Sequence, residues 1–133
     1  MTAPLDNSLV EDATRWRRHL HAHPETAFDE HRTADFVAAK LEEFGIEVHR
    51  GLGGTGVVGT LTRGTGTTAV GLRADMGALF IHEANDVDHR STVDGKMHAC
   101  GHDGHMAMLL GAARHLARHG DFDGTVRFIF QPA

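Results

Sequence analysis

Residues 98–117 read HACGHDGHMAMLLGAARHLA, and the two halves of this stretch differ in character. In the second half, apolar side chains recur every three or four residues, which predicts a helix with one buried face. These apolar positions are Met106, Leu109, Leu110, Ala113, Leu116 and Ala117. Asp103 stands just before them and is expected to cap the N-terminus of this helix. The stretch therefore predicts a helix that begins at a dense group of polar side chains.

Short segments rich in β-branched residues lie on both sides of this helix and predict strands. They cover residues 46–49, 56–62, 68–74 and 125–131. Two further helices are predicted from Ser8 to about His23 and from about Glu30 to Phe44, with stops at Pro24 and Gly45. Helices interspersed with apolar strands indicate an α/β fold, with helices layered on a mixed, partly parallel sheet. Ligands of such sheets gather at the carboxyl ends of the strands.

The segment from Asp75 to Met97 has no clear period. A connection of this length inside a compact domain is usually a functional loop. It leads directly into the polar group at residues 98–105, which places the candidate chemistry between a strand end and a helix start. With no internal repeat or linker, the 133 residues are interpreted as part of a single domain.

Composition excludes several classes of partner. The formal net charge is -5, and acidic and basic residues are interleaved, so no basic stripe is available for nucleic acid. The sequence contains no apolar run of the roughly 18 residues that a membrane span needs. We therefore expect no nucleic-acid partner, no membrane insertion and a cytoplasmic location. The single cysteine excludes an internal disulfide bond.

The segment His98-Ala99-Cys100-Gly101-His102-Asp103-Gly104-His105 concentrates three histidines, one cysteine and one aspartate in eight residues. Thiolate and neutral imidazole are good ligands for zinc and related divalent metals. Two ligands do not hold a catalytic ion, so at least one more must come from elsewhere. Asp75 and Asp103 are the nearest carboxylates in sequence that could orient an imidazole.

Two other interpretations of this segment stay open at the level of residue types. Cys100 with His102 or His105 could form a nucleophilic thiol and base pair. Alternatively, the cysteine is simply buried and the cluster is structural. A second histidine-rich stretch, which contains His19, His21 and His23, favours surface or capping roles, because these positions do not share one helix face.

Taken in order, several motifs resemble one known family, the metal-dependent amidohydrolases of the aminoacylase and carboxypeptidase superfamily. The resemblance is to the branch that contains hippurate hydrolases and auxin-conjugate hydrolases, and it spans most of the chain. It rests on Arg17-Arg18 with Leu20-His21 and Pro24-Glu25, Gly53-Gly54-Thr55-Gly56, residues 71–76 (GLRADM), residues 96–105 (KMHACGHDGH) and Phe130-Gln131-Pro132-Ala133.

The resemblance implies a zinc-peptidase-like catalytic domain with two divalent ions, manganese or zinc, and identifies Cys100 and His102 as metal ligands. It further implies metal-activated water that hydrolyses the amide bond of small N-acyl amino acids or related conjugates, with a glutamate as general base. Asp75 corresponds to a supporting group beside the ligands. Asp103 and His105 are expected to stiffen or line the site.

Two positions depart from the family pattern Asp-Met-Asp-Ala-Leu-Pro, which reads Asp75-Met76-Gly77-Ala78-Leu79-Phe80 here. Gly77 removes a carboxylate and adds backbone freedom, and Phe80 removes a proline with its fixed φ. Both changes are expected to alter the local geometry and the support of the ligands.

In the family, the strand that ends Gln-Pro-Ala continues into a Glu-Glu pair, whereas this sequence ends at Ala133. Residues 1–133 are accordingly interpreted as the N-terminal part of the catalytic domain, without the dimerisation and lid domain through which a full-length relative forms a homodimer. This part is expected to be inactive alone. The alternatives are a truncated, non-catalytic metal-binding or interaction module, and a Cys-His thiol hydrolase.

Overall fold

The computed structural model describes residues 4–5 and 7–132. Every helix and strand predicted from the sequence is present, with small differences at the ends. In chain order the elements are α1 (Asn7–Ala22), α2 (His31–Glu43), β1 (Glu47–Leu52), β2 (Gly56–Arg63), β3 (Ala69–Asp75), α3 (His102–His119) and β4 (Gly124–Gln131).

The strands form one mixed sheet in the order β1-β2-β4-β3. The β1–β2 and β2–β4 pairs are antiparallel, and the β3–β4 pair is parallel. Helix α3 joins the two parallel strands, as crossover geometry requires. In the register of this parallel pair Asp75 lies opposite Gln131, so both strands reach their carboxyl ends at the same edge of the sheet. The predicted partly parallel sheet is therefore confirmed.

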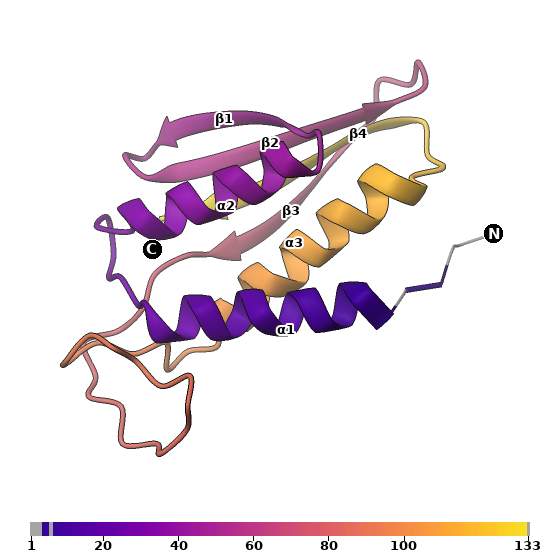
Figure 1. The fold of residues 1–133 in the computed structure, drawn as a ribbon. Helices are drawn as coiled ribbons and strands as arrows, with labels where there is room; N and C mark the ends of the chain where they lie inside the picture. Colours follow the sequence, from indigo (N-terminus) through magenta and orange to yellow (C-terminus); the bar gives the residue numbers. More distant parts are fainter. Residues whose placement is uncertain (1–3, 6, 133) are drawn as a thin grey trace.

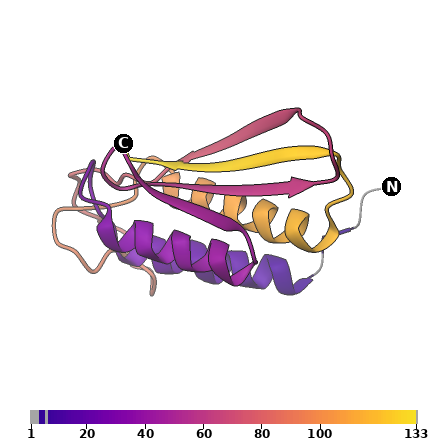
Figure 2. The ribbon, with the colours of Figure 1, turned by 90° about the horizontal axis from the view of Figure 1, so that it is seen from above.

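All three helices lie on one face of the sheet (Figures 1 and 2), where α2 packs on β1 and β2, α3 packs on β3 and β4, and α1 packs on α3. The layer between helices and sheet is the hydrophobic core. Its members with no exposed surface include Val37, Leu41, Val57, Met106, Leu110, Phe128 and Phe130. Complete burial of a side chain of this size contributes about 1.5–3 kcal/mol, so this layer holds the elements in place.

The connection from β3 to α3 has no helix or strand of its own and extends beyond one end of the sheet (Figure 1). Backbone hydrogen bonds nevertheless fix it at several points. Leu79 and Met97 pair across its neck, and the amide of Ala78 donates to the carbonyl of Glu25 at 2.8 Å. The amide of Thr92 donates to the carbonyl of Ala22 at the end of α1. The long connection is thus an ordered loop packed against the end of α1.

The predicted N-cap at Asp103 is wrong. Helix α3 begins at His102, its N-cap position is Gly101 in the left-handed region (φ 83°), and no side chain caps it. Asp103 lies inside the first turn with 2% of its surface exposed. Its carboxylate contacts the side chains of His21 and Arg17, and these partners take the place of the backbone amides at its oxygens.

Candidate metal site

The start of α3 meets the end of β3 through the side chain of His102. Its Nδ1 donates a hydrogen bond to the carbonyl oxygen of Gly77 at 2.6 Å and lies 3.5 Å from Oδ1 of Asp75. The acceptor at Nδ1 fixes the tautomer, because a neutral ring that donates from Nδ1 carries its lone pair on Nε2. Nε2 forms no hydrogen bond within the described part of the chain and is the atom available to a metal.

Cys100 lies two residues before His102, across the tight turn at Gly101, and its thiol is free and exposed. A thiol and an imidazole lone pair, supported by the Asp75 carboxylate, match the donors that zinc and similar ions accept. Residues 4–5 and 7–132 contain no group of three or more side chains arranged to hold an ion. The described chain thus supplies two donors, and any ion bound by them needs further ligands.

The two departures from the family pattern have local consequences. Gly77 uses only its backbone here, donating from its amide to Oδ1 of Asp75 at 2.8 Å and accepting from His102 at its carbonyl. Both contacts survive without a side chain at position 77. Phe80 is 78% exposed, and the ammonium of Lys96 lies 5.6 Å from its ring centroid.

The other two predicted site residues have different environments. The ring of His105 is exposed, and its centroid lies 6.2 Å from that of His102, so the two imidazoles are neighbours. The carboxylate of Asp103 instead contacts His21, at 2.9 Å from Nδ1. The structure therefore brings Asp75 and His105 close to His102, which Cys100 precedes by two residues, and it links Asp103 to His21 and Arg17.

His98 is a further histidine of this region whose environment the sequence did not predict. It is 4% exposed, and neither ring nitrogen has a hydrogen-bond partner among the described residues. Burial lowers the pKa of His98 to about 4, against the opposing effect of Asp103. The ring is consequently neutral at neutral pH, which is the form that binds metals.

The prediction of a surface or capping role is wrong for His21, which is 4% exposed. Its Nδ1 contacts Asp103, and its Nε2 lies 3.0 and 3.1 Å from the carboxylate oxygens of Glu83. The spacing does place His19 and His21 on different faces of the helix, and His23 lies just after its end. One of these faces nevertheless points inward, because the loop that carries Glu83 covers the face where His21 lies.

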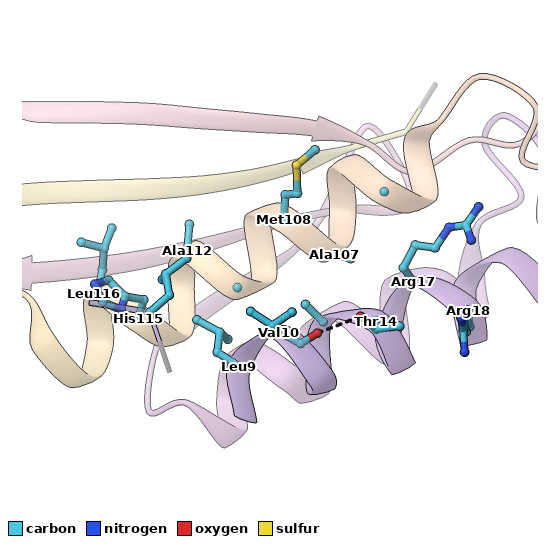
Figure 3. A pocket seen from close by; sticks show the side chains of 14 residues that line it. Leu9, Val10, Thr14, Arg17, Arg18, Ala107, Met108, Ala112, His115 and Leu116 are labelled. Carbon is cyan, nitrogen blue, oxygen red and sulfur yellow. Dashed lines mark hydrogen bonds between the residues drawn. The ribbon is translucent and has the colours of Figure 1, made fainter. Parts of the chain in front are cut away.

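A separate apolar groove of about 760 Å³ lies between α1 and α3 (Figure 3). Side chains such as Leu9, Val10 and Met108 line it, with Arg17 and Arg18 at one end. Neither Cys100 nor His102 lines it. We place the candidate chemistry at the strand and helix ends, because the candidate ligands Cys100 and His102 lie there.

Comparison with known proteins identifies relatives of this chain. Residues 71–133 match the model of peptidase family M20/M25/M40. The chain is 49% identical over 117 residues to a hippurate hydrolase from Campylobacter jejuni, covering 88% of this chain and 30% of that protein. It is 48% identical over 131 residues to an N-acyl-L-amino acid amidohydrolase from Geobacillus stearothermophilus, covering 97% of this chain and 35% of that protein.

The chain belongs to the M20 peptidase family. Its fold agrees with that of the YXEP protein of Bacillus subtilis, described as a dinuclear metal binding peptidase of the M20 family. The TM-score is 0.90 at 42% identity, and the match covers 96% of this chain and 36% of that chain. The resemblance inferred from the motifs is therefore confirmed.

This M20 chain spans about a third of the length of the relatives it matches. Among the described residues, no helix combines the length and the hydropathy that crossing a membrane requires.

Proposed function

We propose that this chain forms the N-terminal part of the catalytic domain of a metal-dependent amidohydrolase. The substrate class is the N-acyl amino acids and related amide conjugates, as the names of its relatives indicate for those proteins. The products are a carboxylic acid and an amino acid. Residues 1–133 alone are proposed to be inactive, because the family's catalytic glutamate is not among them.

The observation that carries this proposal is the fixed ring of His102. Its Nδ1 is engaged by Gly77, so Nε2 is free to bind an ion together with the Cys100 thiolate two residues away. Asp75 supports the ring from the strand end, and His105 lines the approach. The family resemblance adds a second ion, and we propose manganese or zinc for both.

When bound, divalent ions would polarise the amide carbonyl and lower the pKa of a water molecule. The residues of this chain have complementary roles. Cys100 and His102 would bind the ion. The hydrogen bond from Nδ1 to Gly77 and the nearby Asp75 carboxylate keep the His102 ring oriented.

The thiol hydrolase gains no support from the geometry. A nucleophilic cysteine needs an imidazole within hydrogen-bond reach, and no hydrogen bond joins the Cys100 thiol to a histidine in the described residues. A non-catalytic metal-binding module would use the same two ligands. It would differ from the amidohydrolase only because its complete protein does not hydrolyse amides.

The proposal is tested by exchanging the matching third of the Geobacillus amidohydrolase for this chain, which aligns over 131 residues. The chimera should hydrolyse N-acyl amino acids after loading with manganese or zinc, and a chelator should abolish the activity. Cys100→Ala and His102→Ala should each lower kcat/KM by at least about 100-fold, of the order seen when metal sites are damaged.

His31→Ala is the matched control, because this exposed histidine belongs to α2 and lies far along the sequence from the cluster. Its activity should equal that of the parent chimera. Activity that resists chelators but disappears on alkylation of Cys100 would establish the thiol hydrolase instead. Metal binding without turnover, in a chimera that folds normally, would favour the non-catalytic module.

The remaining proposals concern the complete protein. We propose a cytoplasmic homodimer, joined through the domain that the family inserts after the region matched here. Sedimentation of the complete protein and of a variant without that domain tests the dimer, and a monomeric complete protein would contradict it.

A further inference from the structure

Behind the candidate metal site, a buried charged network joins three distant segments of the chain. The ring of His21 at the end of α1 lies between the carboxylates of Asp103, in α3, and Glu83, in the long loop. These side chains are 5%, 2% and 3% exposed, respectively. A buried histidine with a carboxylate at each ring nitrogen is an unusual arrangement that constrains where the protons lie.

Ionised carboxylates only accept hydrogen bonds, so a ring nitrogen of His21 that bonds to one of them is the donor. Burial alone would raise the pKa of Glu83, but hydrogen bonds from His21, the Ser91 amide and Asn85 outweigh it and hold the pKa at about 2. Glu83 is therefore ionised at neutral pH. The three side chains form a buried series in which His21 lies between two carboxyl groups.

Arg17 is the partly exposed member of the network and contacts Asp103. Its Nε lies 2.9 Å from Oδ2 of Asp103, and its Nη1 donates to Nε2 of His89 at 3.2 Å. A guanidinium and an imidazole thus contact two carboxyl groups. Removing one member would leave a buried polar group without its partner, so the network has one favoured arrangement.

This arrangement bears on the metal site because Asp103 directly follows His102. No side chain caps the first turn of α3. The orientation of that turn is instead set by the hydrogen bond from His102 to Gly77 on one side and by the contact of Asp103 with His21 on the other.

We propose that His21 is a positioning residue for the metal site. It holds Asp103, and through Asp103 the turn that carries Cys100 and His102, so that thiolate and imidazole can bind one ion together. This inference rests on the proposed function, since it requires that these two side chains are ligands.

The test uses the chimera described above, in which this chain replaces the matching third of the Geobacillus amidohydrolase. The metal-free chimera is titrated with Co²⁺, and the charge-transfer absorption of a cobalt-bound thiolate is measured. His21→Gln should weaken binding by about 10–100-fold and change the cobalt absorption spectrum, as loss of groups that orient metal ligands does. His19→Gln is the matched control on the same helix, because the exposed ring of His19 stacks on Phe36 instead. The control should bind cobalt with wild-type affinity.

A second pair of variants avoids the risk that His21→Gln fails to fold. Arg17→Gln removes a partner of Asp103 from a side chain that is 39% exposed, and Arg18→Gln changes its exposed neighbour. Arg17→Gln should weaken cobalt binding several-fold, and Arg18→Gln should not. In an Asp103→Asn background, the Arg17→Gln change should have no additional effect, because it acts through Asp103.

Two negative results have different meanings. If the folded chimera with the wild-type sequence gives no cobalt-thiolate absorption, the ligand assignment fails and the positioning role fails with it. If the wild type binds cobalt, but His21→Gln and Arg17→Gln bind within about twofold of their controls, only the positioning role is overturned. Reduced stability with unchanged cobalt affinity and spectrum also overturns it, since a purely structural role produces that result.

Discussion

Replacing Glu83 by glutamine should destabilise the fold at neutral pH. The variant lacks the stabilising effect of an ionised carboxylate, which the wild type loses only in acid. The pKa of Glu83 falls from its ordinary value of 4.5 to about 2 in the folded chain. One pKa unit corresponds to about 1.4 kcal/mol, so the ionised Glu83 carboxylate contributes at most about 3 kcal/mol to the free energy of unfolding. Glu83 lies in a loop with many exposed neighbours, and solvent screening reduces this, so we expect about 1–2 kcal/mol.

The direction follows from the lowered pKa. A carboxyl group with a folded pKa below its unfolded pKa stabilises the fold fully above about 4.5, and this contribution is lost as the pH falls toward 2. Glu83→Gln should therefore be less stable than the wild type by about 1–2 kcal/mol at pH 7, and the difference should be smaller at pH 3.

Urea unfolding at low protein concentration measures both differences, with the fluorescence of the buried Trp16 as the probe. Glu42→Gln is the control, because Glu42 is exposed on α2, and it should match the wild type at both pH values. An equal deficit for Glu83→Gln at pH 7 and pH 3 would refute the reasoning, because the loss would then not come from the ionised carboxylate.

Three further predictions concern packing, capping and association. Gly59→Ala should lower the unfolding free energy by about 1 kcal/mol, because the added Cβ would lie 3.1 Å from methyl carbons of both Leu41 and Ile46; unchanged urea unfolding would contradict this. Glu25→Gln should cost about 1 kcal/mol, because its carboxylate accepts hydrogen bonds from two amides in the first turn of α2; an unshifted thermal transition would argue against that role. Val70→Lys should reduce concentration-dependent association, because Val70 is 54% exposed on the edge strand β3; equal sedimentation of variant and wild type at high concentration would oppose it.

The elements of the fold were predictable because each depends on a local pattern. The helical period around Leu109 predicts burial on one face, and the core confirms it. The strand before Asp75 was predictable from its β-branched residues, although most of its residues are exposed. The proximity of the strand end at Asp75 to the helix start at His102 was predictable as well, since a parallel strand end and the helix that follows it meet at one edge of the sheet.

The charged network was not predictable from the same information. His21 and Asp103 are 82 residues apart, and Glu83 lies in a loop without a period. Only the packing of α1 against α3 and the loop brings them together. Without these partners, the local rule for a carboxylate at a helix start assigns Asp103 to capping, and the error at this position arises from that rule.

The position of β4 also determines the order in which the sheet can assemble during synthesis. Although β4 is the last strand of the described chain, it lies between β2 and β3 and pairs with both. On a ribosome, β1 and β2 can form a hairpin early, but β3 has no strand partner until residues 124–131 have left the exit tunnel. Over that interval the edges of β2 and β3 that β4 will occupy stay unpaired, and a nascent chain is then most exposed to mispairing with other chains.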